Sequence, residues 1–144
     1  RTQFVIHLAK QTYLNSKPSF PSPKTGICDA EIFFSQGKFT LNKAARSELS
    51  KASRCLRKYP TQKILITGHT DPLKPQYGEG SKLNNVQLGL RRAEAVMNSL
   101  TKDGFDSGRF TITSVGSKDP MSTGKSEKSL KKNRRAQIFS SPEI

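Results

Sequence analysis

The spacing of apolar residues changes repeatedly along this chain, and that change restricts the fold more than any other feature. Short strand-like runs alternate with stretches in which apolar residues recur at helical spacing. The strand-like runs are 30–34, 63–67, 109–115 and 135–139, and the helical stretches are 41–59 and 84–104. The order strand, helix, strand, helix, strand, strand predicts an α/β two-layer sandwich, with two main helices packed on one mixed sheet of about four strands.

Capping residues support both helices. Asn42 is a suitable N-cap for the first helix, and Pro60 stops it. Either Asn84 or Asn85 can cap the second helix, and Gly104 can end it. The helix boundaries therefore agree with the apolar spacing.

The first 27 residues differ in composition from the rest of the chain. A short alternating piece at 4–8 is followed by a segment at 16–26 that holds three prolines and several small polar residues. This pattern predicts an extended arm or linker over 1–27 and one domain over 28–144. No apolar run is long enough to cross a bilayer. Because the sequence opens at Arg1 without a methionine, we expect an upstream signal or membrane segment.

The chain is strongly basic, with 25 Lys and Arg residues against 11 Asp and Glu residues and a formal net charge of +14. Such a surface attracts anions, which include nucleic acid, acidic lipid head groups and anionic cell wall, and net charge alone does not choose among them. Simple solvation is the alternative. The Lys-rich stretch after Gly116 lacks the interleaved aromatic residues that nucleic-acid binding requires, so we expect no nucleic-acid partner.

The sequence offers no constellation for catalysis, a metal or a cofactor. His7 and His69 are the only histidines, and no GxSxG, HExxH or phosphate-loop motif occurs. The two cysteines, Cys28 and Cys55, do not form a CxxC pair, which leaves a disulfide and two buried free thiols as open alternatives. We therefore expect a binding protein without a cofactor.

Three motifs occur in order along the chain. They are Gly68-His69-Thr70-Asp71, Asn85-x-x-Leu88-x-x-x-Arg92-Ala93-x-x-Val96, and Asn133-Arg134-Arg135. Over about residues 28 to 140 the chain thus resembles the OmpA-like C-terminal domain family, which includes peptidoglycan-associated lipoprotein and motility protein B. The resemblance implies non-catalytic binding of peptidoglycan in the bacterial periplasm, which would anchor an envelope protein or complex to the cell wall.

The resemblance also implies the principal contacts, which are Asp71 and Arg92 against the diaminopimelate of an uncrosslinked stem peptide. The free end of diaminopimelate carries an ammonium and a carboxylate, so a specific site needs one anion and one cation. A guanidinium can hold a carboxylate through two parallel hydrogen bonds, which a lysine cannot do. The positive end of the second helix adds to this attraction. A plain surface salt bridge between the two residues is the alternative.

Further site residues follow from the same motifs. We expect Asn85 to cap the helix and position the loop and to touch the ligand, with capping alone as the alternative. Thr70 is expected to present a hydroxyl or a backbone amide to the ligand, with an exposed threonine at the strand end as the alternative. Arg134 and Arg135 are expected to serve the fold and the rim of the site, with one of them, Arg135 in particular, reaching the ligand. His69 is expected to be a hydrogen-bonded structural residue, with pH sensing as a second interpretation. A periplasmic location favours a disulfide between Cys28 and Cys55.

The chain departs from the family pattern in three places. The segment 72–84 is longer than usual, and we expect it to form an exposed, mobile rim. Gly89 replaces the family's serine, which weakens the helix slightly. The segment after Pro120 is rich in lysine, at Lys125, Lys128, Lys131 and Lys132.

These departures support a rival interpretation, in which the chain is a structural or stator-type module of a membrane complex that has lost or weakened its peptidoglycan binding. In that case the arm before Cys28 would serve to form a homodimer or to link the domain to a membrane helix. The two interpretations share one fold and differ only at the site.

Overall fold

The computed structural model describes residues 26–74 and 79–141, which form one four-stranded sheet with helices against it. The strands are β1 (Ala30–Phe33), β2 (Lys63–His69), β3 (Phe110–Gly116) and β4 (Arg135–Ser141). The helices are α2 (Lys43–Arg57), α3 (Asn85–Lys102), the short α4 (Glu127–Lys131) and a 3-10 turn, η2 (Ser107–Arg109). The predicted arm over 1–27 lies outside the described residues except for its last two.

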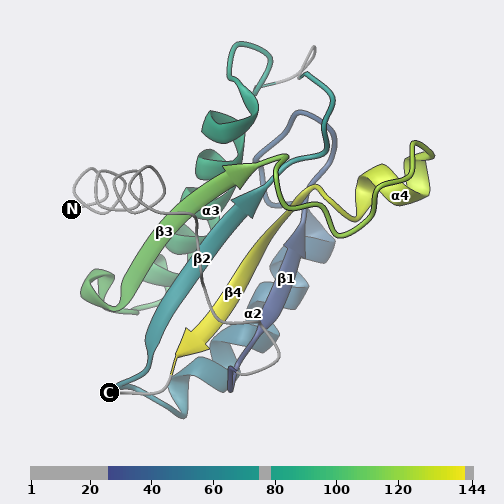
Figure 1. The fold of residues 1–144 in the computed structure, drawn as a ribbon. Coiled ribbons are helices and arrows are strands. Elements are labelled where there is room, and N and C mark those ends of the chain that lie inside the picture. Colours follow the sequence, from purple (N-terminus) through teal and green to yellow (C-terminus); the bar gives the residue numbers. More distant parts are fainter. Residues whose placement is uncertain (1–25, 75–78, 142–144) are drawn as a thin grey trace.

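The sheet is mixed, and its strand order is β1-β4-β2-β3. β2 and β3 run parallel, whereas β4 runs antiparallel to both of its neighbours. The two long helices α2 and α3 cover the same face of the sheet, and α4 lies apart from them beyond the end of β1 (Figure 1). The predicted two-layer α/β sandwich is therefore confirmed. Within the described ranges, no helix combines the length and the hydropathy that crossing a membrane would require.

The core lies between the sheet and the two long helices. Each strand contributes isoleucine or aromatic side chains to it at every second position, as strand geometry requires, and each helix contributes one apolar stripe. The side chains with at most 1% exposure include Ile32, Ile64, Ile66, Ile112, Ile138, Leu56, Val96, Met97 and Leu100. Arg92 is the largest fully buried side chain, and it shares this interior.

Side-chain caps fix where the two long helices begin. The Asn42 side chain accepts a hydrogen bond from the Ala45 N–H (2.8 Å), as predicted for α2. At α3 the cap is Asn84, which accepts from the Gln87 N–H (2.8 Å) while the Gln87 side chain accepts from the Asn84 N–H (2.9 Å). The expectation that Asn85 caps this helix is therefore wrong, because the reciprocal pair requires the residue three positions before Gln87.

The backbone of α3 lies unusually close to the backbone of β2 where two glycines face each other. A Cβ built on Gly68 would lie 1.7 Å from the Gly89 carbonyl oxygen, and one built on Gly89 would lie 2.3 Å from Oγ of Ser114. Only glycine fits such a contact between helix and strand. Gly89 is thus more than a weakened helix position, because a serine there would overlap Ser114. The contact holds Arg92, one turn further on, beside the end of β2.

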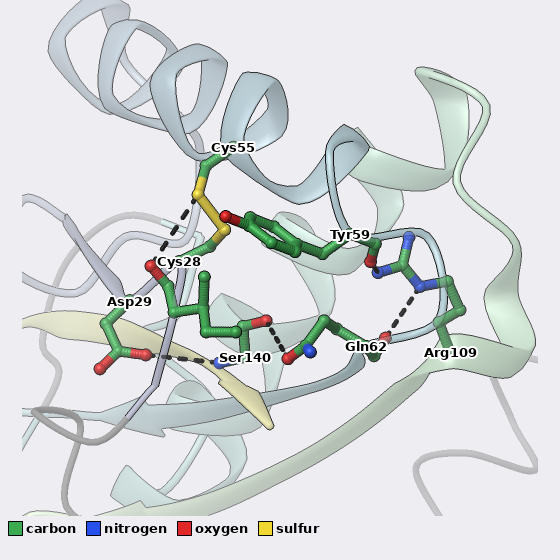
Figure 2. The surroundings of a disulfide bond; sticks show 8 residues. Cys28, Asp29, Cys55, Tyr59, Gln62, Arg109 and Ser140 are labelled. Atoms are coloured by element: carbon green, nitrogen blue, oxygen red, sulfur yellow. Dashed lines mark hydrogen bonds between the residues drawn. A yellow bond between two sulfur atoms is a disulfide. The ribbon is translucent and has the colours of Figure 1, made fainter. Parts of the chain in front are cut away.

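A disulfide joins Cys28, just before β1, to Cys55 in the last turns of α2, with an S–S distance of 2.04 Å (Figure 2). The same short segment is also held by hydrogen bonds, since the Ser140 N–H donates to the Asp29 carboxylate and the Ile27 N–H donates to the Ser140 carbonyl. The alternative of two free buried thiols is therefore wrong. The start of β1 is fastened both to α2 and to β4.

Replacing both Cys28 and Cys55 with serine should lower the free energy of unfolding by about 3 kcal/mol, because the chain-entropy model assigns this value to a cross-link that closes a loop of this length. Urea unfolding followed by circular dichroism measures the change. Adding reductant to the wild-type protein should reproduce it, and reductant should have no effect on the double variant. Equal stability of both proteins would show that the bridge constrains nothing.

Candidate functional site

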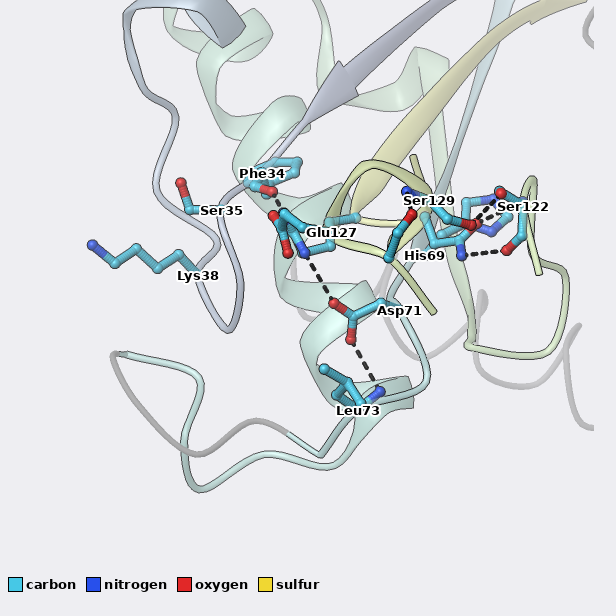
Figure 3. Close-up of polar contacts among 12 residues, drawn as sticks. Phe34, Ser35, Lys38, His69, Asp71, Leu73, Ser122, Glu127 and Ser129 are labelled. Atoms are coloured by element: carbon cyan, nitrogen blue, oxygen red, sulfur yellow. Dashed lines mark hydrogen bonds and ion pairs between the residues drawn. The ribbon is translucent and has the colours of Figure 1, made fainter. Parts of the chain in front are cut away.

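Asp71 lies just after β2, and its carboxylate is buried. The residue is 4% exposed, and its Oδ2 lies 3.2 Å from a terminal nitrogen of Arg134 (Figure 3). The other carboxylate oxygen, Oδ1, accepts a hydrogen bond from the Leu73 N–H at 3.0 Å. The carboxylate therefore has one charged partner and one backbone partner, which hold it in one orientation.

Arg134 connects this buried carboxylate to the surface. One terminal nitrogen pairs with Asp71, the other lies 2.5 Å from a carboxylate oxygen of Glu127, and Nε donates to the Phe34 carbonyl oxygen at 3.1 Å. The Glu127 side chain is 70% exposed, and the hydrogen bond from Arg134 lowers the pKa of Glu127 below its ordinary value. The three residues form a charged chain that runs from the interior to α4.

Arg92 is fully buried, and its guanidinium holds the loop after β1. It donates to three backbone carbonyl oxygens, those of Lys38 (2.8 Å), His69 (2.9 Å) and Ser35 (3.1 Å). The guanidinium also lies 5.3 Å from the centre of the Phe34 ring. Burial lowers the pKa of Arg92 to about 10, while the negative charge of Asp71 opposes this shift. Arg92 therefore stays a cation at neutral pH.

The structure brings the two predicted contacts, Asp71 and Arg92, into one electrostatic cluster and adds Arg134 to it. The alternative of a surface salt bridge between them does not hold, because both side chains are buried and Asp71 pairs with Arg134 instead. Together with Glu127, the cluster holds two carboxylates and two guanidiniums, so its formal charges balance. Such a cluster can attract a carboxylate while it offers a carboxylate to an ammonium.

The described end of the long segment 72–84 is fastened to the loop after β1. The Glu79 carboxylate accepts hydrogen bonds from the Phe39 N–H (2.8 Å) and from the Thr40 hydroxyl (2.5 Å). The Gly80 N–H donates to the carbonyl oxygen of Gly37 at 3.0 Å. The predicted exposure is confirmed at 72–74 and at Glu79, although hydrogen bonds fasten Glu79 and Gly80 to the loop after β1. The mobility of the segment stays a prediction. We call the hydrogen bonds of Glu79 and Gly80 the Glu79 clasp.

The hydrogen bonds of the Glu79 clasp also change the pKa of the Glu79 carboxyl group. Burial raises the pKa of its carboxyl group, but the hydrogen bonds from Thr40 and Phe39 outweigh burial, and the net pKa is lowered. The ionised form of Glu79 is thus the form that the loop stabilises. Residues 75–78 lie outside the described residues.

Thr70 and Asn85 lie on either side of Gly116. The Thr70 N–H donates to the Gly116 carbonyl oxygen at 2.9 Å, and a Cβ on Gly116 would lie 3.3 Å from the Asn85 backbone carbonyl carbon. The side-chain oxygens Oγ1 of Thr70 and Oδ1 of Asn85 are buried, and neither has a hydrogen-bond partner among the described residues. Buried polar atoms without a partner are rare, and they concentrate at functional sites.

Arg135 points to the face of the sheet opposite α2 and α3, away from Asp71. Its Nε and one terminal nitrogen donate to the Gln137 side chain at 3.1 and 2.7 Å. Adjacent strand residues face opposite sides, and Ala136 and Ile138 belong to the core. Of these two arginines, the structure brings Arg134 to the cluster around Asp71 and places Arg135 on the other face of the sheet. The alternation of buried and exposed faces along β4 could have separated the two arginines from the sequence alone.

His69 is a structural residue, as expected. It is 2% exposed, and a hydrogen bond joins it to the Asp119 backbone. Burial and the nearby charge of Arg135 lower the pKa of His69 to about 3, against the hydrogen bond to Asp119. The ring is thus neutral at neutral pH, and its Nδ1 has no partner within the described ranges.

Two open clefts flank the loop after β1. The larger, of about 510 Å³, is lined by Phe33, Phe34, Ser35, Gln36, Asn42, Ala44, Ala45, Glu48, Glu127, Lys131 and Arg134. The smaller, of about 390 Å³, is lined by Ser35, Lys38, Thr40, Asn42 and Glu79. Neither is lined by Asp71 or Arg92, which lie beneath the loop. Of the four predicted lysines, which are all exposed, only Lys131 lines a cleft.

Comparison with known proteins places these features in a family. A model of the OmpA family matches residues 33–134. The peptidoglycan-associated lipoprotein of Buchnera aphidicola is 33% identical over 75% of this chain and 59% of its own length. The peptidoglycan-associated lipoprotein of Haemophilus influenzae is 31% identical over 73% of the chain and 65% of its own length. The chain thus spans less than two thirds of either relative.

Solved structures of related proteins share the fold of this chain. The peptidoglycan-associated lipoprotein of Burkholderia pseudomallei superposes with a TM-score of 0.66 at 27% identity, over 87% of this chain and 97% of that one. The cell wall anchor of the type VI secretion system of Pseudomonas aeruginosa gives 0.69 at 25% identity, over 80% and 81%. The periplasmic domain of Helicobacter pylori MotB shares the fold, with 0.69 at 23% identity over 78% and 69%. Since the family model matches most of the chain, this chain belongs to the OmpA family.

Proposed function

We propose that this chain is a non-catalytic anchor that binds peptidoglycan in the bacterial periplasm. Two observations support the proposal. Relatives that are 31–33% identical to it over about three quarters of its length are named peptidoglycan-associated lipoprotein, and a structural neighbour is described as a cell wall anchor. The motif residues of the site are present and form one buried charged cluster. By this proposal the chain is one part of a longer envelope protein or complex.

We further propose that the bound group is the free end of diaminopimelate, and the charge cluster carries this assignment. Asp71 accepts the ammonium, and the flanking guanidiniums of Arg92 and Arg134 attract the carboxylate. A guanidinium has five N–H donors, and three of those on Arg92 go to backbone carbonyls. The other two remain for a ligand. The side-chain oxygens of Thr70 and Asn85 supply further polar contacts at the edge of the cluster.

The proposed ligand reaches Asp71 when the loop after β1 moves. Asp71 is 4% exposed, and the carbonyl oxygens of Ser35 and Lys38 stand over the Arg92 guanidinium. The contacts that hold this loop include the hydrogen bonds to Arg92, those between Phe34 and Arg134, and the Glu79 clasp. Among the described residues, no disulfide holds it. Rearranging a few hydrogen bonds is compatible with binding, because the ligand replaces them with its own.

The variant Asp71→Asn tests the site against general charge attraction. It keeps the shape of the side chain and makes the protein more positive, so attraction to an anionic wall would strengthen. If Asp71 holds the ammonium, the same change should weaken binding about tenfold or more, because a charged hydrogen bond contributes about 1.5–3 kcal/mol. Pull-down with purified sacculi at low and moderate salt, with folding checked by circular dichroism, measures the difference.

Two controls accompany this experiment. Replacing Lys125, Lys128 and Lys132 with glutamine removes general positive charge from exposed positions, and it should reduce only the salt-sensitive part of binding. The stem tripeptide that ends in diaminopimelate should compete with sacculi for the wild-type protein, whereas the same tripeptide ending in lysine, whose free side-chain end has the ammonium but no carboxylate, should not. Retained binding in Asp71→Asn, together with loss in the lysine variant, would contradict the diaminopimelate assignment.

The second candidate function is a module that keeps the fold and has lost its ligand. One observation favours it: the Arg92 guanidinium is fully buried and already bonded to three carbonyls, beneath a loop that the Glu79 clasp holds. Under this interpretation wild-type protein does not sediment with sacculi at any salt concentration. The pull-down therefore separates the two candidates before any variant is made.

A further inference from the structure

We propose that the domain contacts a bilayer with anionic phospholipid head groups through the end of α2 that lies beside the start of β1. The contact surface, which we call the α2 patch, consists of Ile27, Lys51, Arg54, Lys58 and Tyr59. All five residues are exposed. The inference goes beyond the proposed function, because the patch contains no motif residue and a bilayer contains no peptidoglycan.

Three cations of the patch form one row on α2. Lys51, Arg54 and Lys58 are separated by three, four and seven positions, and residues at these spacings are neighbours on the surface of a helix. The row lies on the side of α2 away from the core, since Ala52 and Leu56 of the same helix are buried in the core. The helix thus presents a line of positive charge to its surroundings.

The two apolar members of the patch lie at the disulfide. Ile27 precedes Cys28, which is bonded to Cys55, and Ile27 and Lys51 line one shallow hollow of about 200 Å³. The Tyr59 side chain points toward the disulfide from the chain that follows α2 (Figure 2). Ile27 is 45% exposed and Tyr59 is 39% exposed. The cross-link therefore brings exposed apolar surface next to the row of cations.

Most cations at this end of α2 have no carboxylate partner. No salt bridge within the described ranges involves Arg54, Arg57 or Lys58. Lys51 pairs with Glu48 at 3.1 Å, but both side chains are at least half exposed, so solvent screens this pair. Each lysine or arginine near an anionic bilayer strengthens binding by about a factor of five. The row therefore suits a negatively charged surface.

The combination of cations with apolar side chains favours a bilayer over an anionic polymer. Cations meet the phosphates of the head groups, while a tyrosine ring lies at the level of the head groups and an aliphatic side chain inserts just below them. An anionic polymer would engage Arg54 and Lys58 but would offer no apolar layer to Ile27 and Tyr59. The chemistry of the whole patch is met only by anionic lipid.

The patch lies at the end of the domain opposite the Asp71 cluster. β1 starts and α2 ends beside the patch, whereas Asp71 follows the far end of β2 (Figure 1). The seven residues of β2 separate the two ends by about 20 Å. The chain upstream enters the domain at Ile27, so a preceding segment held in a membrane would bring the patch to that membrane. The opposite end then stays free for the cell wall.

Co-sedimentation of the full chain with vesicles tests the inference. Vesicles of phosphatidylcholine and phosphatidylglycerol should bind the wild type more tightly than vesicles of phosphatidylcholine alone. The double variant Arg54→Gln/Lys58→Gln should bind the anionic vesicles about 25-fold more weakly, because two factors of about five are lost. Circular dichroism checks that each variant is folded.

The double variant Lys43→Gln/Arg46→Gln is the matched control. It also removes one lysine and one arginine from exposed positions of α2, but at the other end of the helix. Arg46 and Arg54 are about 12 Å apart along the helix axis, which exceeds the Debye length of about 8 Å at physiological salt. The control should therefore bind anionic vesicles as the wild type does.

Fluorescence reports whether the patch itself reaches the lipid. Because the chain has no tryptophan, Tyr59→Trp introduces a single one, whose emission should shift to shorter wavelength on anionic vesicles and be quenched by brominated lipid. Met121→Trp is the control, since Met121 is 44% exposed and lies between β3 and α4. Its emission should not change.

Three outcomes would overturn the inference. They are equal binding of the wild type to both kinds of vesicle, equal losses in the two double variants, and unshifted emission of Tyr59→Trp. Vesicles contain no peptidoglycan, and Asp71 is unchanged in every variant. Failure here therefore leaves the sacculus experiment unaffected, and failure of the sacculus experiment leaves this inference unaffected.

Discussion

Replacing Arg92 with alanine should lower the free energy of unfolding by about 3–5 kcal/mol. The substitution leaves the buried carbonyl oxygen of His69 and the part-buried ones of Ser35 and Lys38 without their donor. A buried group left unsatisfied costs about 1–3 kcal/mol, and the part-buried ones cost less. It also leaves Asp71 with Arg134 as its only cationic neighbour in the cluster. Urea unfolding followed by circular dichroism measures the loss.

The adjacent residue provides the control. Arg91 lies on the same helix with a side chain that is 51% exposed, and its nearest carboxylate oxygen, on Glu94, is 4.0 Å away. Arg91→Ala should change stability by less than about 1 kcal/mol, as expected for an exposed pair. Similar losses in Arg91→Ala and Arg92→Ala would show that the carbonyl contacts contribute nothing. For the same reason, loss of ligand binding in Arg92→Ala would not by itself identify a contact residue.

The second large effect is expected in acid and comes from His69. Its pKa is about 3 in the folded protein against 6.5 ordinarily, so the unfolded chain binds the proton first as the pH falls. Stability is therefore present above pH 6.5 and is lost as the pH drops toward 3. The loss should reach about 2 kcal/mol at pH 5 and on the order of 4 kcal/mol near pH 3.

Urea unfolding of the wild type and of His69→Gln at pH 7, 6 and 5 isolates this contribution. Glutamine keeps an N–H donor for the Asp119 backbone and does not titrate, so its stability should fall less over the same range. His7 and all carboxylates are common to both proteins and cancel in the comparison. An identical pH dependence of the two proteins would show that the pKa of His69 is the same in the folded and the unfolded protein.

The order of elements could be predicted from the sequence because apolar spacing reports which face of each element is buried. The four strands and two long helices follow from it, and Asn42 was identified as a cap. Apolar spacing alone does not separate Asn84 from Asn85 as the cap. The glutamine three positions after Asn84 does, because its side chain bonds back to the Asn84 N–H, and this local pattern is present in the sequence.

The site was less predictable, because its contacts join segments that lie far apart in the sequence. Motifs identified Asp71 and Arg92, but spacing along the chain does not show that Arg92 binds carbonyls of the loop after β1. Glu79 was also missed, since its partners, Phe39 and Thr40, lie about forty positions earlier. Arg134 could have been preferred to Arg135 from strand alternation alone.

Under the proposed anchoring function, the disulfide changes how the domain bears a pulling force. Tension on the chain upstream reaches the domain at Cys28, where the bridge leads it into α2 as well as into β1. β1 is an edge strand of four residues, paired only with β4, and alone it would peel away from the sheet. Because the covalent bond shares such a force with α2, which packs on the core, β1 carries only part of it.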